Sequence, residues 1–243
     1  MSDESYILVS GATGVVGAAV TRELLRRGQR VVATYAHSVS TAQALRSGAP
    51  PGCLETVAAD LTDLCGIEQL LAELDVREFQ VAGFVHAAAL VDHTATVNLD
   101  PFRFGEVLMV NVTAAYAIAR ALAARGTLAS VVLLSSIGSE FGDLGSVAYT
   151  TSKGAVDALT RALASELAPM RVNAVAPGVV RSHRTAEDPV FSSSDFAARI
   201  PLGNLVDPIA LSDVVAFLLG PESRAMTGQI VRVDGGHSVR LLS

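Results

Sequence analysis

The chain has 243 residues, 50% of them hydrophobic, and a formal net charge of −6 at pH 7. This length suits one α/β domain with a substantial core, and the acidic balance, with a pI near 5.3, argues against nucleic acid as the main partner. We find no run of about 18 uncharged apolar residues, so we expect no membrane span.

The ends and the cysteines suggest where the protein works. Residues Met1 to Ser5 are polar and acidic and lead directly into an apolar run, which is unlike a signal peptide. Cys53 and Cys65 are isolated and lack the spacing of metal ligands. We therefore expect a reduced protein in the cytoplasm, with no bound metal.

Short apolar runs alternate with helix-length segments along the chain. The predicted strands cover residues 6–10, 30–34, 56–59, 81–85, 130–134, 171–175 and 229–233. The predicted helices cover 15–27, 66–74, 101–124, 147–168 and 208–219. Apolar strands that alternate with helices indicate a parallel sheet covered on both faces. We predict an α/β fold with a doubly wound parallel sheet of Rossmann type, in a single domain spanning 1–243.

Residues 181–200 break this alternation. The segment is polar, rich in serine and without a clear period, so we interpret it as a surface excursion or a lid over a substrate. Phe191, Phe196 and Ile200 stand among its polar residues and indicate a moderately apolar substrate.

A glycine-rich turn follows the first predicted strand and opens the first predicted helix. In Ser10-Gly-Ala-Thr-Gly-Val-Val-Gly17, glycines let the backbone approach a pyrophosphate, whose charge meets the free N–H groups at the helix start. The setting of strand, turn and helix predicts dinucleotide binding. The candidate contacts in this turn are Gly11, Thr13, Gly14, Val15, Val16 and Gly17.

The end of the second strand bears on the choice of dinucleotide. NAD enzymes usually carry an acid there for the ribose 2′-hydroxyl, but residues 34–38 contain none, which favours NADP over NAD. The same stretch contains no Arg. Tyr35, His37 and Ser38 are candidates for this end of the cofactor, and His37 and Ser38 are equally well interpreted as ordinary loop residues. After the third strand, Asp60 and Leu61 are candidates for the adenine, with a helix cap as the alternative for Asp60.

Of the 18 Lys and Arg residues, only one is a lysine, Lys153, and it stands four residues after Tyr149. Lysine and arginine are not interchangeable, and a spacing of four brings a phenol and an ammonium to one helix face. An isolated Lys153 would be interpreted as an ordinary surface residue. Here the glycine turn and further motifs accompany it.

Together these motifs resemble the short-chain dehydrogenase/reductase family over nearly the whole chain. Ser136, thirteen residues before Tyr149, matches the family's catalytic serine, and Asn111 matches the asparagine of its central helix. Pro177 and Gly178 match the turn beside the nicotinamide, with Val180 close behind. Residues 226–236 match the C-terminal strand, and Ser182 replaces the usual threonine.

Two motifs depart from the compact branch of that family. The glycine turn has the Gly-x-x-Gly-x-x-Gly spacing of the extended branch, and His86-Ala87-Ala88-Ala89 replaces the usual Asn-Asn-Ala-Gly. We expect altered detail around the cofactor, which Ala87, Ala88 and Ala89 would contact, with the chemistry kept. We interpret His86 as a packed structural residue.

The resemblance implies a catalytic tetrad of Asn111, Ser136, Tyr149 and Lys153. Tyr149 would act as general acid in reduction, and because a free phenol has a pKa near 10, the Lys153 ammonium and the charge of the nicotinamide would lower it. Lys153 would also bond the nicotinamide ribose, and Ser136 the substrate oxygen. Asn111 would hold a water that passes protons to Lys153.

The substrate class is a ketone or a secondary alcohol, with an oxoacyl group or a secondary-metabolite ketone as options. The spacing of Tyr149 and Lys153 disfavours the family's enoyl reductases, which use seven residues. Bacterial β-ketoacyl-carrier-protein reductases are similar, but Ser165 and Glu166 stand where those use an Arg to dock the carrier. An NAD-dependent alcohol dehydrogenase and a non-catalytic dinucleotide sensor or scaffold remain alternatives. By resemblance we expect a homotetramer or homodimer, paired through the helices at 101–124 and 147–168.

Overall fold

The computed structural model describes residues 5–142 and 144–241. The interpretation of the acidic start at Met1 to Ser5 therefore falls almost wholly outside the described residues, as do both ends of the 1–243 domain.

Seven parallel strands form one sheet in the order β3-β2-β1-β4-β5-β6-β7. Their bounds are β1 Tyr6–Ser10, β2 Arg30–Tyr35, β3 Leu54–Ala58, β4 Val81–His86, β5 Ser130–Leu134, β6 Arg171–Pro177 and β7 Ile230–Val233. The central strands β1, β4 and β5 are buried along their whole length, as their continuous apolar sequences predict. The predicted doubly wound fold is confirmed.

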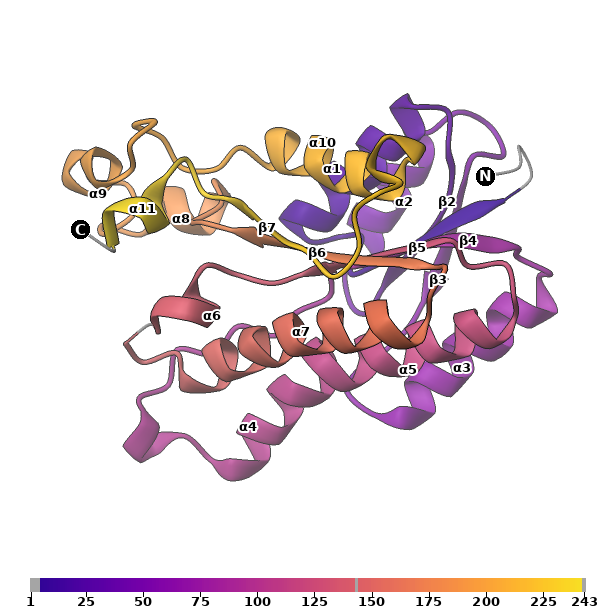
Figure 1. Ribbon diagram of the computed structural model, residues 1–243, viewed down its shortest axis with the longest axis horizontal. Coiled ribbons are helices and arrows are strands. Elements are labelled where there is room, and N and C mark those ends of the chain that lie inside the picture. The colour runs from indigo at the N-terminus through magenta and orange to yellow at the C-terminus, as the bar shows by residue number, and fades with distance from the viewer. Residues whose placement is uncertain (1–4, 143, 242–243) are drawn as a thin grey trace.

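Helices cover both faces of the sheet (Figure 1). One face carries α1 (Val15–Arg26), α2 (Val39–Ser47) and α10 (Pro208–Leu219), and the other carries α3 (Leu64–Val76), α4 (Pro101–Leu108), α5 (Ala114–Ala124) and α7 (Val147–Glu166). Each face has its own apolar core, because the strands project alternate side chains to opposite sides. Four short helices, α6 (Gly138–Phe141), α8 (His183–Glu187), α9 (Ser194–Arg199) and α11 (His237–Leu241), gather at one end of the molecule (Figure 1).

The helix predicted over 101–124 is interrupted. A π-helical turn, Met109–Thr113, separates α4 from α5, and the Ala114 N–H bonds the carbonyl of Met109, five residues back. The whole stretch, Pro101–Ala124, is the one helix of the described residues that is long and apolar enough to cross a membrane. Its residues Ala114, Ile118 and Leu122 are buried in the core, where α5 packs beside α3.

Two further elements differ from the sequence prediction. Helix α2 was not predicted, since only Ala42 and Leu45 of its residues are buried and its apolar stripe is correspondingly short. Residues 181–200 are more ordered than a polar loop, because Ser182 and Ser193 cap α8 and α9 by accepting backbone N–H groups.

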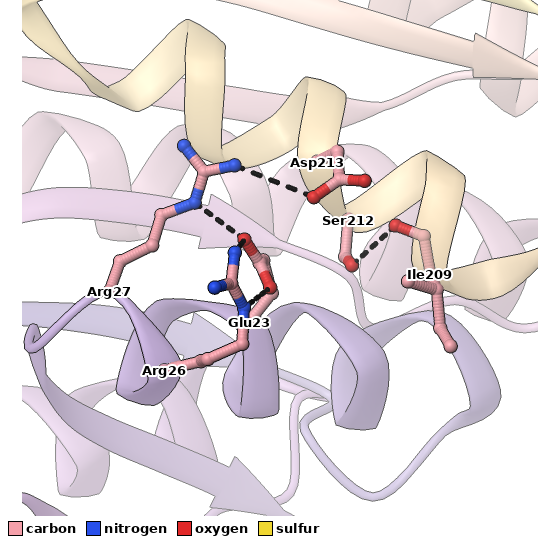
Figure 2. A network of polar contacts seen from close by, with 6 residues as sticks. All are labelled: Glu23, Arg26, Arg27, Ile209, Ser212 and Asp213. Atoms are coloured by element: carbon pink, nitrogen blue, oxygen red, sulfur yellow. Dashed lines mark hydrogen bonds and ion pairs between the residues drawn. The ribbon is translucent and has the colours of Figure 1, made fainter.

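A polar network joins α1 to α10 on the upper face (Figure 2). The buried carboxylate of Glu23 accepts from Arg26 at 2.7 Å and from Arg27 at 2.6 Å, and Arg27 reaches Asp213 on α10 at 3.4 Å. These hydrogen bonds and charges, with that of Arg26 the largest cause, lower the pKa of Glu23 to about 2. The network lies on the outer side of this helix pair, in which α1 packs on β1 and β2 and α10 packs on β5 and β6.

Candidate active site

The candidate site lies where the winding of the sheet reverses. From β1 the chain proceeds outward to β2 and β3, then returns to place β4 on the other side of β1. In open α/β sheets this switch point leaves a crevice at the carboxyl ends of the strands. A cleft of about 680 Å³ occupies it, lined by the start of α1, the ends of β5 and β6, α6, α7 and the lid segment.

The glycine turn is shaped by close backbone contacts. Gly11 has a φ of +65°, and a Cβ there would lie 2.5 Å from the Cα of Ala88; a Cβ on Gly17 would lie 2.2 Å from the Gly11 carbonyl oxygen. These two glycines therefore permit the turn itself. Gly14 is the N-cap of α1 and has no side chain to cap the helix, and its own N–H donates to the Gly11 carbonyl at 3.1 Å. The first turn holds no acid. Its residues Val15, Val16 and Gly17, whose N–H groups have no partner within the helix, line the cleft beside Gly14.

The predicted adenosine end lies outside the cleft. Tyr35, His37, Ser38, Asp60 and Leu61 do not line it, and neither do Gly11, Thr13 or Ala88. Leu61 is buried in the core. The alternative of Asp60 as a helix cap is wrong, because Asp63 is the residue that caps α3, through the Gly66 N–H. Asp60 instead accepts the N–H and hydroxyl of Thr62, and these bonds, together with nearby His37, lower the pKa of its carboxyl.

Tyr149 and Lys153 lie one turn apart on α7, and both line the cleft. Lys153 is 2% exposed, and its ammonium lies 5.4 Å from the centre of the Tyr149 ring and donates to the Leu134 carbonyl at 2.6 Å. Burial lowers the pKa of Lys153 to about 8, against the opposing effect of the Asp157 carboxylate one turn further along α7. This lysine is therefore a buried residue of the site, and the surface interpretation is wrong.

Ser136 follows β5 and lines the same cleft. Its hydroxyl accepts the Gly138 N–H at 3.1 Å, and its carbonyl accepts the Ser139 hydroxyl at 2.7 Å. Ser139 also lies 2.7 Å from Asp157 Oδ2, which ties the loop after β5 to α7. The structure thus brings Ser136, Tyr149 and Lys153 to one wall of the cleft, as the sequence predicts.

Asn111 lies behind this wall, fully buried in the π-helical turn. Its Oδ1 accepts the Leu90 N–H at 2.7 Å, and its Nδ2 donates to the Leu90 carbonyl at 3.0 Å and to Ser152 Oγ at 2.9 Å. Both N–H donors of the amide are therefore used to fix the loop after β4 against α7. The predicted water relay through Asn111 stays a prediction.

His86 is a packed residue, as the sequence predicts. Its Nε2 faces the Val110 carbonyl at 2.9 Å, so this nitrogen must donate, and Nδ1 accepts from Ser10 Oγ at 2.9 Å. Burial first, and the charge of Lys153 second, lower the pKa of His86 to about 4. A neutral imidazole thus joins β1, β4 and the π-helical turn.

Most of the remaining residues predicted to contact the cofactor or substrate also line the cleft. Ala87 and Ala89 after β4 line the cleft, as do Pro177 at the end of β6 and Gly178, Val180 and Ser182 after it. Ser182 forms a capping box with Thr185, each side chain accepting the other residue's N–H. Ile200 does not line the cleft, since it packs against Gly235, whereas Phe191 and Phe196 do line it.

Sequence reasoning missed several residues of this cleft. They are Val91, His93, Ile137, Phe141, His183, Arg184, Arg199 and His237. They come from separate loops and short helices that meet only in the fold, so no local spacing signals them. The clearest sequence signal for any of them is the Asp-Gly-Gly turn at 234–236, which follows β7 and directly precedes His237.

These features define a class of protein. An uncapped helix start behind a close-packed glycine turn fits a pyrophosphate, and a phenol, an ammonium and a serine hydroxyl line the same cleft. This is the arrangement of a dinucleotide-dependent oxidoreductase. Among the described residues no cluster of three or more His, Cys, Asp or Glu could hold a metal.

Comparison with known proteins leads to the family. Residues 11–238 match a family model described as enoyl-(acyl carrier protein) reductase. L-xylulose reductase from Bos taurus is 34% identical, and (3R)-3-hydroxyacyl-CoA dehydrogenase from Mus musculus is 30% identical, each over 94% of both chains. A structure from Beutenbergia cavernae, assigned as an NAD(P)-dependent gluconate 5-dehydrogenase and holding NADP at low occupancy, is 33% identical with a TM-score of 0.87, covering 98% of this chain and 97% of its own.

The chain belongs to the short-chain dehydrogenase/reductase family of NAD(P)-dependent oxidoreductases. The resemblance inferred from the sequence is confirmed.

Proposed function

We propose that this protein is an NADP-dependent carbonyl reductase, working reversibly as an alcohol dehydrogenase on a ketone and its secondary alcohol. The observation that carries the proposal is the single cleft that contains Ser136, Tyr149 and Lys153 beside the uncapped start of α1. When bound, the nicotinamide cofactor supplies or accepts the hydride.

The protein's part is to place the carbonyl and to move a proton. Ser136 donates to the substrate oxygen and polarises it, and Tyr149 protonates that oxygen during reduction. Lys153, held by Leu134, places a positive charge near the Tyr149 ring and favours the phenolate that forms. Asn111 supports this wall through Leu90 and Ser152, with a water-borne proton path to Lys153 as its further proposed role.

The substrate proposal is a ketone, because Tyr149 and Lys153 are four residues apart and the family's enoyl reductases use seven. An oxoacyl thioester, carrier-bound or free, and a secondary-metabolite ketone are the two options within this class. The similarity to a hydroxyacyl-CoA dehydrogenase supports the first. We propose that the enzyme works in the cytoplasm, with residues 181–200 as its substrate lid.

The NAD-dependent alcohol dehydrogenase is kept as a second candidate because of Asp60. Its carboxylate lies near His37, beside the predicted place of the ribose 2′-position, and it holds its charge to low pH. A carboxylate there would repel a 2′-phosphate, while His37 and Ser38 would accept either cofactor.

The test compares NADPH and NADH oxidation by the purified protein across a panel of ketones. We expect turnover with NADPH at a higher kcat/KM than with NADH; the reverse ratio identifies the NAD enzyme. Tyr149→Phe should bind cofactor normally yet lose turnover, and substantial activity in that variant would refute the assignment of Tyr149. Absence of turnover with every ketone and both cofactors would favour the sensor or scaffold.

A further inference from the structure

The outer part of the cleft is lined by basic groups. Six basic side chains line the cleft: His93, Lys153, His183, Arg184, Arg199 and His237. No Asp or Glu of residues 5–142 and 144–241 does so. In a protein with 24 acidic residues and a net charge of −6, this is a local reversal of sign.

Both arginines of the cleft lack an ion-pair partner among the described residues, although suitable acids lie nearby in the sequence. Arg184 has Asp188, and Arg199 has Asp195, at the four-residue separation that favours ion pairs within a helix. Neither arginine forms an ion pair within the described chain. Asp188 accepts the Val190 N–H instead. By contrast, the neighbouring Arg181 pairs with Asp207, and His183 pairs with Glu187.

His237 supplies a second, independent observation. Its Nδ1 atom is buried and has no hydrogen-bond partner among the described residues, which is costly unless a ligand or water satisfies it. Its ring packs edge-on against Phe196 at 5.4 Å, and Phe196 packs against Phe191 at 5.1 Å. The nearest acid along the chain, Asp234, is used by the backbone, since its carboxylate accepts the N–H groups of Gly236 and Ser238.

The lid end of the cleft thus combines an apolar wall with unpaired positive charge. Figure 1 shows α8, α9 and α11, which carry Arg184, Arg199 and His237, side by side at this end of the molecule. Arg184 and Arg199 are exposed to solvent, whereas His237 Nδ1 is buried. An apolar substrate would cover the two guanidinium groups and offer neither them nor the ring nitrogen a partner. A substrate with an anionic group would satisfy all three while its carbon chain packs on Phe191 and Phe196.

We propose that the substrate carries a carboxylate, bound by Arg199 and Arg184 with His237 beside them, at the opposite end from the ketone that Tyr149 protonates. This rests on the proposed function, and it adds the substrate class: a keto acid or hydroxy acid in place of a neutral ketone.

The experiment uses matched substrates and the complete enzyme with NADPH. Acetoacetate and levulinate are each compared with their methyl esters, which keep the ketone and remove the charge. We expect a kcat/KM for the acids about tenfold or more above that for the esters, the size of one charge-assisted hydrogen bond. Added salt should lower the acid-to-ester ratio of kcat/KM, because ions from solution reach the outer cleft and screen its charges.

Arginine variants identify the groups. Arg199→Gln and Arg184→Gln should each lower the acid-to-ester ratio about tenfold, mainly through the KM of the acid, while Arg199→Lys keeps part of it. Arg224→Gln is the matched control, because Arg224 is an exposed arginine outside the cleft that forms no ion pair among the described residues. This variant should change the kcat/KM of neither the acids nor the esters. Calorimetric binding of levulinate to Tyr149→Phe saturated with NADPH gives a readout without turnover, and His237→Gln in that background should weaken it.

The two proposals fail differently. If neither these compounds nor any ketone of the wider panel is turned over with NADPH or NADH, the proposed function is wrong. If the esters and the acids have equal kcat/KM values and the arginine variants change both values equally, the proposed anionic site is wrong. The proposed reductase activity is then unaffected. A rise in the KM of NADPH with no change in the acid-to-ester ratio would assign the arginine to the cofactor, which also overturns the proposal.

Discussion

His86 is a buried side chain at the position of the first asparagine of a family motif. The compact branch uses Asn at this position, whereas here a neutral imidazole spans the Ser10 hydroxyl and the Val110 carbonyl. The same hydroxyl of Ser10 lies 3.5 Å from the Ala88 N–H, so one group joins the glycine turn to the loop after β4. The glycine turn and the altered loop after β4 are therefore packed against each other.

The pKa of His86 predicts acid sensitivity. Its pKa falls from 6.5 in the unfolded chain to about 4 in the fold, so the unfolded chain binds the extra proton between these values. Stability from this group is complete above pH 6.5 and is lost as the pH falls through 4, by about 3 kcal/mol at most. Urea unfolding should show that His86→Asn removes this part of the pH dependence. Equal pH dependence in both proteins would contradict the prediction.

At Lys153 we expect a positive charge alone to be insufficient for activity. Its ammonium fits a buried slot where it bonds the Leu134 carbonyl, and a guanidinium is wider and planar. We expect Lys153→Arg to lower kcat by about a hundredfold or more, the range for a disabled proton transfer. Steady-state kinetics with saturating NADPH measures this, and circular dichroism checks the fold. A fully active Lys153→Arg enzyme would make the lone lysine an accident of composition.

At the scale of elements, Glu23 is the centre of the polar network that reaches from α1 to α10 through Arg27 (Figure 2). Its pKa of about 2, against 4.5 in the unfolded chain, gives stability that is present above pH 4.5 and lost as the pH falls toward 2. Glu23→Gln should therefore lower the midpoint of urea unfolding at pH 7 and converge with the wild type near pH 2. Glu73→Gln, which breaks an exposed pair with Arg77, is the control and should change little. An equal fall in the midpoint of urea unfolding in both variants would show that the burial of Glu23 does not add to its stabilising effect.

Elements with a strong period were predictable, and those fixed by tertiary contacts were not. The strand Tyr6–Ser10 and the helix Pro208–Leu219 have the predicted bounds, because apolar runs and an Asp-Pro start are local signals. The π-helical turn at Met109–Thr113 has no such signal. It is stabilised by Asn111 reaching Leu90 and by His86 reaching the Val110 carbonyl, contacts between segments distant in the chain.

The same division holds for the site. Tyr149, Lys153 and Ser136 have fixed spacings along the chain, so the sequence predicts their meeting. Arg199 and His237 meet only because α9 and α11 fold to one end of the molecule. Chemistry common to a family is carried by spacing, while the part of the cleft that we propose selects the substrate is assembled from short helices without a pattern.

At the scale of the whole molecule, the outer surface of α7 predicts association. Ala158 and Ala162 are exposed one turn apart, and on α5 Tyr116 is 45% exposed. Small residues let two helices approach closely across a two-fold axis, and the exposed ring adds apolar area. We expect this surface, formed by α5 and α7, to be an interface between copies of the chain.

Light scattering after gel filtration should therefore give the mass of a dimer or tetramer. Ala158→Arg places a long charged side chain where the helices would meet, so it should shift the protein toward smaller species. Ala210→Arg is the matched control, since Ala210 is exposed on α10, on the opposite face of the sheet. A monomeric wild type, or dissociation by Ala210→Arg and not by Ala158→Arg, would move the interface away from α7. Because Lys153 and Tyr149 lie on that same helix, loss of association should also raise the KM of the cofactor, whose binding wall α7 forms.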